Sequence, residues 1–187
     1  MGKRFDSIDE RLQQFIEKQP VFFVATAPLE SDGHLNLSPR GLDSLRVIDP
    51  KTVAFVDLTG SGIETIAHIK QNQRIVLMVC AFEGPPKIVR LHGRGEVIEP
   101  SNPEFATLVE KFPTYEGVRA VIRISCQRIS DSCGFGVPLM EYQGQRTLMG
   151  DWADRKGVDG VLEYQQEKNV TSIDGLPGLV RRDGETE

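Results

Sequence analysis

The sequence predicts a mainly β protein, an antiparallel β-barrel of about six short strands with flanking helices. Runs rich in β-branched and aromatic residues, at 52–58, 74–82 and 87–98, have the composition of strands. Short turns rich in Gly, Pro and Asp separate these runs. Gly93 and Gly95 lie inside one run and indicate a bulge or a barrel corner, so we expect the sheet to close on itself.

The N-terminal part is expected to hold one helix and two strands. Ser7 and Glu10 have the spacing of a capping box, which predicts an amphipathic helix over residues 7–18. Strands are predicted over residues 21–27 and 34–38, because the stretch between them has the composition of a hairpin turn.

The central part is expected to supply the rest of the barrel. Further strands are predicted over residues 45–48, 52–58, 74–82, 87–98 and 119–127. A helix is predicted over residues 62–71, and its His68 is expected at the surface. A second capping box, Ser101 with Glu104, predicts a helix that covers the barrel.

The 187 residues suit a single domain. We expect a barrel core over residues 21–130 and a C-terminal appendage over about 131–180, with a mostly polar helix over 151–169. Residues 181–187 are expected to be disordered.

Composition excludes several classes of function. The formal charge of −5 argues against a nucleic-acid partner. No apolar run has the length of a signal peptide or a membrane span, which predicts a cytoplasmic protein with no membrane association. Cys80 and Cys126 fit the core, Cys133 is left open, and neither cysteine nor histidine spacing indicates a metal site.

A glycine-rich junction lies at the centre of the chain. The run that ends at Leu58 is followed by Thr59, Gly60, Ser61 and Gly62, and the apolar spacing then becomes helical. Amides at a helix N-terminus and glycines that allow close approach can bind an anion such as phosphate. The same junction is also compatible with a plain strand-to-helix connection.

The flanking segments make the sequence resemble a known family. Residues 36–41 carry a Ser and an Arg before a Gly, and residues 87–97 read Lys-Ile-Val-Arg-Leu-His-Gly-Arg-Gly-Glu-Val. With the junction between them, this order resembles the pyridoxamine 5′-phosphate oxidase-like FMN-binding split barrels, over roughly residues 21–130. The resemblance implies a split barrel and an FMN cofactor.

Eight residues are candidates for cofactor binding. They are hydroxyls, charged groups and a glycine in the three segments above: Ser38, Arg40, Asp57, Thr59, Ser61, Gly62, Lys87 and Arg90.

These candidates have different expected roles. Arg40 is the first choice for the FMN phosphate, because guanidinium binds phosphate in a bidentate manner. Thr59 and Ser61 could donate to phosphate or cap the helix. Asp57 would repel phosphate, so it is expected at the ring or ribityl portion if it contacts FMN. Lys87 could equally be an edge charge that discourages strand aggregation.

The resemblance implies an FMN-dependent oxidoreductase that acts on an undefined small molecule, without assigned catalytic residues. Two departures argue against vitamin B6 oxidation: Ile88 replaces a family Gln, and residues 176–180 replace a terminal Trp-Arg segment. A non-catalytic flavin-binding or stress-related module, and a relative that uses F420 or haem, remain alternatives.

We also expect a homodimer. A six-stranded barrel is too narrow to enclose a flavin, so FMN should lie outside it, at a subunit interface. Residues 132–152, including Phe135 and Trp152, are candidates for crossing to the partner, although Trp152 could equally pack on its own barrel.

Overall fold

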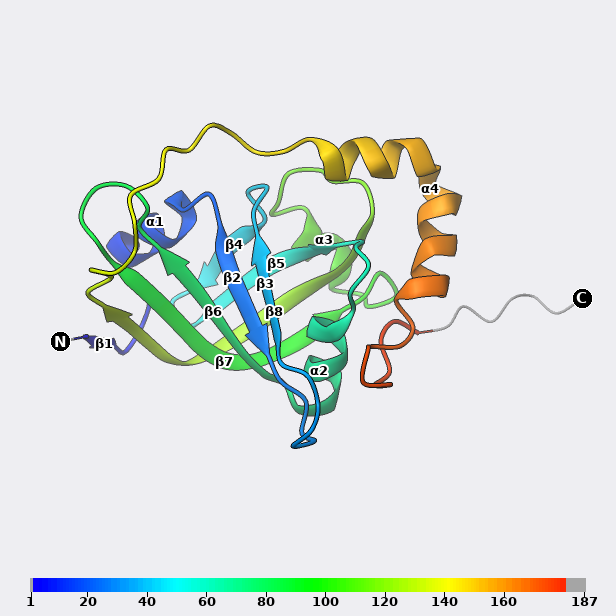
Figure 1. Cartoon of the computed structure of the whole chain (residues 1–187), viewed down its shortest axis with the longest axis horizontal. Helices are drawn as coiled ribbons and strands as arrows, with labels where there is room; N and C mark the ends of the chain where they lie inside the picture. Colours follow the sequence, from blue (N-terminus) through cyan, green and yellow to red (C-terminus); the bar gives the residue numbers. More distant parts are fainter. Residues whose placement is uncertain (1, 181–187) are drawn as a thin grey trace, which may run out of the picture.

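An eight-stranded antiparallel sheet curls into a split barrel in the computed structural model, which describes residues 2–180 (Figure 1). The strands are β1 (Arg4–Phe5), β2 (Phe22–Thr26), β3 (Asn36–Arg40), β4 (Leu45–Asp49), β5 (Thr52–Leu58), β6 (Arg74–Cys80), β7 (Ile88–Ile98) and β8 (Val118–Ser132). Their order is β3-β2-β6-β7-β8-β5-β4, with β1 added to β8. The split lies between the outer strands β3 and β4. The predicted fold class is confirmed, although the sheet has more than the six or so strands expected. Strand β1 has no counterpart among the seven predicted strand ranges.

Four helices accompany the barrel: α1 (Glu10–Lys18), α2 (Glu64–Asn72), α3 (Phe105–Val109) and α4 (Leu148–Lys168). Helix α2 packs near one end of the barrel against β2, β6 and β7, while α1 lies by β4 (Figure 1). The disorder predicted for residues 181–187 lies outside the described residues.

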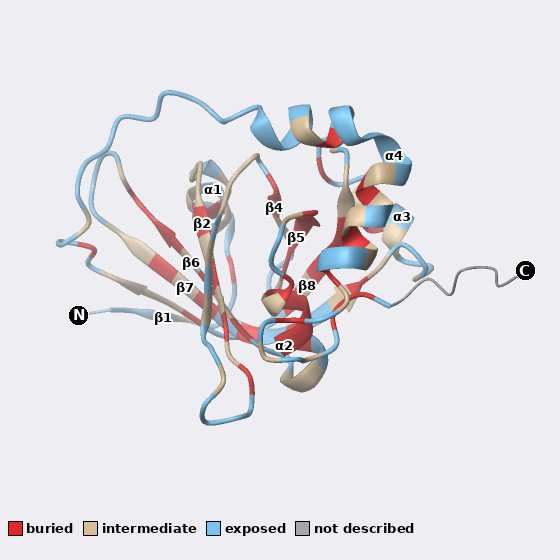
Figure 2. Ribbon diagram, turned by 45° about the vertical axis from the view of Figure 1, so that its right-hand side comes forward, coloured by how far each residue is buried: buried red, intermediate tan, exposed pale blue. Residues whose placement is uncertain are grey.

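The barrel interior is the main hydrophobic core, and buried residues follow the inward faces of the strands (Figure 2). Phe22 of β2 and Phe55 of β5 meet edge-on, with ring centroids 5.6 Å apart, although these strands are not neighbours in the sheet. A smaller cluster under α3 includes Leu108, Phe112 and Val121. The interior is therefore filled by side chains, as expected for a small barrel.

The first predicted helix start is wrong by a few residues. Asp9, not Ser7, is the N-cap, and its carboxylate accepts a hydrogen bond from the Leu12 amide over 2.8 Å. The Ile8 amide donates to the Pro50 carbonyl over 2.7 Å, which ties residue 8 to the β4–β5 turn. Because of this tie, the helix begins only at Glu10.

The second predicted capping box is also wrong. Helix α3 spans only five residues, and no side chain caps its first turn. The Glu104 carboxylate instead accepts hydrogen bonds from Arg123 on β8, the shorter of them over 2.6 Å. Tertiary pairing thus takes the acidic group that the local pattern had assigned to the cap.

Strands β7 and β8 form the longest ladder, and a bulge interrupts it at Gly93, as predicted. A Cβ at Gly93 would lie 2.3 Å from the Ser125 carbonyl oxygen, so only glycine fits there. Strand β8 extends to Ser132, five residues past the predicted end at 127.

An irregular segment, residues 133–147, leaves β8 and crosses the end of the sheet to reach α4 (Figure 1). We call this segment the strap. Helix α4 bends at Gly157, whose φ of 68° falls in the region that favours glycine. After the bend, the second half of α4 runs along the barrel beside the β5–α2 junction.

Candidate functional site

Asp57, near the end of β5, is a fully buried carboxylate held between two arginines. Arg119 Nε of β8 donates to Oδ2 over 2.8 Å, and Arg40 Nη1 of β3 donates to Oδ1. Burial alone would raise the pKa of Asp57, but the two guanidinium groups outweigh burial and lower it. Two cations and one anion leave the Arg40–Asp57–Arg119 triad with one net positive charge.

Arg40 connects the edge strand β3 to β5 across the split of the barrel. Its guanidinium carbon lies 5.7 Å from the centroid of the Phe55 ring. Its Nε is buried and has no hydrogen-bond partner within residues 2–180. The Arg40 side chain as a whole keeps 19% of its surface exposed and lines the cavity described below, so its guanidinium group is accessible to a ligand there.

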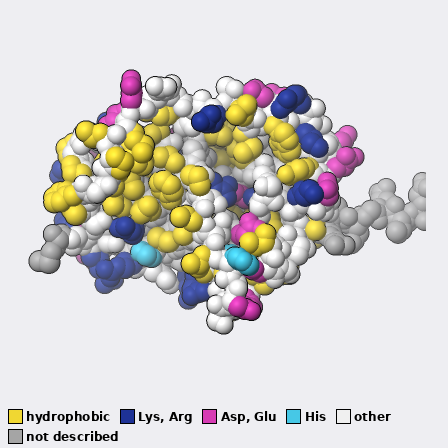
Figure 3. Space-filling model, viewed as in Figure 1, with side chains coloured by type: hydrophobic (Ala, Val, Ile, Leu, Met, Phe, Trp, Pro, Cys, Tyr) yellow, Lys and Arg dark blue, Asp and Glu magenta, His cyan; other side chains and the backbone are white. Residues whose placement is uncertain are grey.

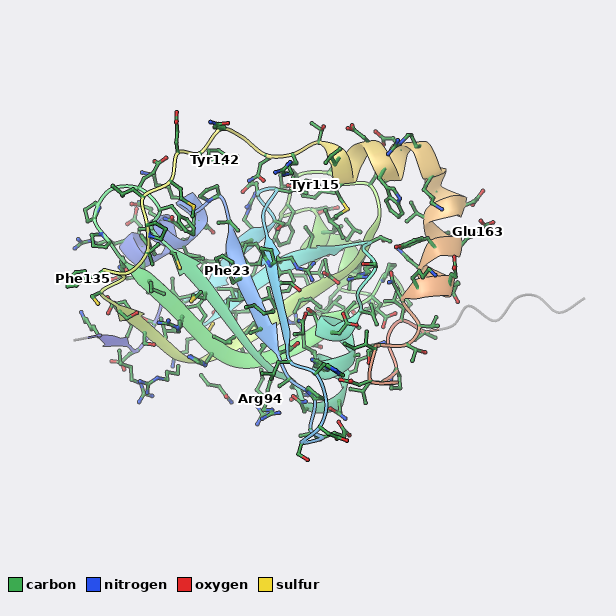
Figure 4. All side chains as sticks on the ribbon, in the orientation of Figure 1. Phe23, Arg94, Tyr115, Phe135, Tyr142 and Glu163 are labelled. Atoms are coloured by element: carbon green, nitrogen blue, oxygen red, sulfur yellow. The ribbon has the colours of Figure 1, made fainter. Side chains whose placement is uncertain are left out.

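A cavity of about 1640 Å³ lies outside the barrel and includes Arg40 in its wall. It is bounded by α1, the start of β2, the end of β3, the β6–β7 hairpin and the strap. Phe23 and Pro39, which pair across β2 and β3, line it on the outer face of the sheet. Tyr142 lines it from the strap, and Figure 4 shows this residue above the sheet that carries Phe23. Such a volume exceeds the usual 300–1,000 Å³, roughly, of a small-ligand pocket.

Three predicted residues lie in or beside the cavity. Arg40 and Lys87 both line it. Arg90 Nη1 donates to Ser132 Oγ over 2.9 Å, and Ser132 is itself in the wall. The structure therefore brings the predicted cations of β3 and of the β6–β7 hairpin to one cavity.

Ser38 belongs to a separate polar network on the neighbouring part of β3. Its hydroxyl donates to Asn36 Oδ1 over 3.0 Å, and Asn36 Nδ2 donates to Thr26 Oγ1 and Thr65 Oγ1. Thr26 Oγ1 in turn bonds His68 Nδ1 over 2.9 Å.

The surface position predicted for His68 is wrong, since the residue is fully buried. It lies on the face of α2 that packs toward β2, where it completes the network around Thr26. Burial lowers the pKa of His68, which keeps the ring neutral near pH 7.

The glycine-rich junction lies outside the cavity wall, and much of its polar surface is bonded within the chain. Thr59 Oγ1 donates to the Gly117 carbonyl over 2.7 Å and accepts from Gln165 Nε2 over 2.8 Å. The Gly60 carbonyl accepts from Asn169 Nδ2 over 2.9 Å. The second half of α4 and the residues after it thus cover this side of the junction.

The start of α2 already holds a carboxylate. A Cβ placed at Gly62 would lie 2.5 Å from Glu64 Oε2, so this side chain folds back over the first turn. A negative group there is favoured by the helix dipole. Ser61 and Gly62 themselves are exposed, so their predicted role at a ligand stays a prediction.

Arg119 was not among the predicted site residues, although it completes the triad. The available signal was Asp57 itself, an acid inside an apolar strand, which requires a cationic partner if it is buried. Arg119 begins the last predicted strand, and its register beside β5 brings it to Asp57.

Other candidate chemistry is limited. Cys133 lines the cavity and is exposed, while Cys80 is buried and Cys126 half-buried. Within residues 2–180, no group of three His, Cys, Asp or Glu side chains is placed to hold a metal ion. None of the helices in that range has the length and apolar character needed to cross a membrane.

Apolar side chains gather on the face that carries β2, β3 and β6, and on the strap (Figure 3). Strongly exposed examples on β3, its preceding turn and the strap are Leu35, Leu37, Phe135 and Leu139, all at least two-thirds exposed. Phe135 points outward at the far end of the strap (Figure 4). Large exposed apolar patches are typical of interaction surfaces.

Solved structures with similar folds support the split barrel. A single-residue variant of HupZ from Group A Streptococcus superposes with a TM-score of 0.53 at 22% identity, covering 67% of this chain and 99% of that one. A candidate pyridoxamine 5′-phosphate oxidase from Lactobacillus delbrueckii gives 0.52 at 18% identity, covering 68% of this chain and 98% of that one.

Sequence comparison gives the family. The pyridoxamine 5′-phosphate oxidase family model matches residues 8–133, more than half of the chain. The pyridoxamine 5′-phosphate oxidase family protein ustO of Aspergillus flavus is 39% identical over 192 residues, which cover 94% of this chain and 77% of the relative. The chain therefore belongs to the pyridoxamine 5′-phosphate oxidase family.

Proposed function

We propose that this protein binds FMN and catalyses the oxidation or reduction of a small molecule. Membership of the pyridoxamine 5′-phosphate oxidase family makes a flavin cofactor the first candidate ligand. The observation that carries the proposal is the Arg40–Asp57–Arg119 triad. The triad has a net positive charge, and its Arg40 side chain, which is 19% exposed, lines a large cavity. A phosphate dianion suits this position, since guanidinium forms charge-assisted hydrogen bonds with phosphate.

The residues around the cavity fit the two chemical demands of FMN. Arg40 would hold the phosphate at the wall of the cavity. Phe23, Pro39 and Tyr142 supply the apolar surface that a flat ring requires. When bound, FMN supplies the electron-transfer chemistry, and the chain binds and orients it.

A homodimer is part of this proposal. The cavity lies outside a barrel whose interior is already filled. The face that carries β3 exposes Leu35 and Leu37, and the strap exposes Phe135 and Leu139. A second copy of the subunit would cover that face and complete the wall of the FMN site, as symmetric dimers commonly do. Light scattering tests this: a monomer that keeps stoichiometric FMN would exclude the shared site.

The cofactor itself is tested by denaturing the purified protein and measuring the mass of any released ligand. We expect FMN, and we expect added FMN to raise the melting temperature, because a ligand that prefers the folded state stabilises it. A deazaflavin or haem in the released fraction would replace FMN in the proposal. No thermal shift with saturating FMN would refute it.

Turnover is tested separately. Reduction of the bound FMN by NADH or NADPH, followed by oxidation with a panel of acceptors, would establish the oxidoreductase. Absence of reduction by any donor would favour a flavin-binding module without catalysis. Pyridoxamine 5′-phosphate belongs in the substrate panel, where we expect no turnover because of Ile88 and the different C-terminal segment.

A further inference from the structure

Helix α1 presents a second, polar face to the cavity. Leu12 and Ile16 pack into the barrel core. Arg11, Phe15 and Lys18 all line the cavity, and their spacing of four and three residues places them on one side of the helix. One short helix therefore closes the core with one face and carries two cations to the cavity with the other.

Lys87 of the β6–β7 hairpin adds a third cation beside this face. Its Nζ lies 4.8 Å from the centroid of the Phe15 ring. No acidic side chain in residues 2–180 forms an ion pair with Arg11, Lys18 or Lys87. We call these three residues the cationic wall.

The acids of the cavity lie on the β6–β7 hairpin, on the strap and near the end of β8, and none of them belongs to α1. The Met140 amide donates a hydrogen bond to the Phe82 carbonyl over 2.9 Å, which joins the strap to the hairpin. Glu83 and Glu141 are the residues that follow Phe82 and Met140, so these two acids flank that contact. Asp131 Oδ1 accepts from the Lys3 amide over 2.7 Å.

The cavity is thus charged unevenly, and its wall holds more cations than acids. The cations are Arg11, Lys18, Arg40, Lys87 and Arg146, and the acids are Glu83, Asp131 and Glu141. This excess occurs in a chain whose net charge is −5.

The remaining wall is apolar and adaptable. The strap contributes Met140 and Tyr142, and the start of α4 contributes Met149. The strap has no helix or strand, and one of its few ties to the barrel is a hydrogen bond from Gln145 Nε2 to the Pro20 carbonyl over 3.0 Å. Methionine side chains are flexible and accommodate apolar groups of varied shape.

We propose that the substrate is an amphiphilic anion, with a bulky apolar body under the strap and a carboxylate or phosphate against the cationic wall. The inference rests on the proposed function, because it names the substrate class of the same cavity. A volume of about 1640 Å³ leaves room for such a molecule beside FMN. Arg40 serves the cofactor phosphate, and the cationic wall serves the substrate.

A matched pair of probes tests this assignment. 1-Anilinonaphthalene-8-sulfonate is an apolar anion, and N-phenyl-1-naphthylamine is the same framework without the sulfonate. Their dissociation constants are measured by equilibrium dialysis against FMN-saturated protein, for the wild type and for Arg11→Gln with Lys18→Gln. The control variant combines Lys51→Gln with Arg155→Gln, which removes the same charge at exposed positions outside the cavity wall.

We expect the cavity variant to bind the sulfonate about three- to tenfold more weakly, as two partly exposed charge contacts would predict. The uncharged probe and FMN should change by less than about twofold, and the control variant should bind both probes like the wild type. Equal losses for both probes, or no loss for either, would overturn the proposal. Weaker FMN binding in the cavity variant would also overturn it, by assigning the cationic wall to the cofactor phosphate.

The experiment separates this inference from the proposed function. Failure of the protein to bind FMN would refute the proposed function, and the same dialysis without FMN would still report the charge preference of the cavity. A protein that binds FMN and shows no preference for the anionic probe would keep the function and lose the substrate class.

Discussion

Two polar regions lie on either side of Asp57, and they differ in where their hydrogen bonds go. At the β5–α2 junction, Thr59 and Gly60 are bonded by Gln165, Asn169 and other groups of the same chain. On the cavity side, Arg40 Nε has no partner in the described part of the chain. At the junction, Asn169 Oδ1 is also buried without a partner among the described residues, so the two regions are distinguished by access. The second half of α4 covers the junction, whereas Arg40 lines the cavity. We therefore interpret the junction as structural and the Arg40 side as ligand-binding.

The largest effect should come from the carboxylate between the two regions. Asp57→Ala should destabilise the fold by about 3–5 kcal/mol, because it leaves two arginines without their buried counter-charge. Urea denaturation measures the change in the free energy of unfolding. As a control, Glu96→Ala removes an exposed partner of Arg123 and should cost about 0–1 kcal/mol. Similar losses in the two variants would mean that the triad is not a special element of the core.

The next effect tests the cavity side. Arg40→Ala should weaken FMN binding by about 1.5–3 kcal/mol, the usual value of a charge-assisted hydrogen bond. Riboflavin, which lacks the phosphate, should lose far less, and Arg40→Lys should be intermediate for FMN. Calorimetric titration of the folded variants gives these affinities.

Arg40→Ala should also lower stability, because Asp57 then keeps only Arg119. Titrations therefore belong at temperatures where urea curves show the variant fully folded. If FMN and riboflavin lost the same affinity, Arg40 would not act on the phosphate.

A variant at the junction should lose stability and keep its FMN affinity, in contrast to the variants of Arg40. Asn169→Ala removes a donor to the Gly60 carbonyl and should cost about 1–2 kcal/mol of stability, with FMN affinity unchanged. Glu163→Ala, on the solvent side of α4, is the control and should change neither quantity (Figure 4). A loss of FMN affinity in Asn169→Ala would remove the contrast between the two regions and return the junction to the ligand site.

The smallest effect concerns the C-terminal loop, which is tied to the β2–β3 hairpin. His34 Nδ1 and Asp174 Oδ1 lie 2.6 Å apart, and the Asp174 hydrogen bond and charge raise the pKa of His34. Because the folded-state pKa is raised, this stabilisation is complete below about pH 6.5 and is lost as the pH rises through the folded-state pKa.

Amide hydrogen exchange of residues 171–179, corrected for intrinsic rates, should therefore become faster between about pH 6 and pH 8.5. The junction and the barrel should show no such change. His34→Ala should remove the pH dependence of the loop, and a dependence that persisted in this variant would assign it to another group.

Local patterns were sufficient for most elements of the fold. Seven of the barrel strands and the Gly93 bulge follow from alternation and turn chemistry, which depend on neighbouring residues. Both predicted capping boxes were wrong because a residue distant in sequence forms the hydrogen bond instead. The Ile8 amide donates to the Pro50 carbonyl, and Arg123 donates to the Glu104 carboxylate. The surface position predicted for His68 was wrong for a similar reason, because β2 covers the face of α2 that carries this residue.

What the sequence by itself determined is the fold class, the family resemblance and the placement of Arg40 and Lys87 among the candidate cations. Only the tertiary structure decided that Arg40 and Arg119 meet at Asp57, across separations of 17 and 62 residues. It also decided that the strap and α1 bound one cavity whose wall holds more cations than acids. The physical reason is range: periodicity and turn chemistry are set by adjacent residues, whereas ion pairing, burial and cavity shape depend on which distant surfaces pack together.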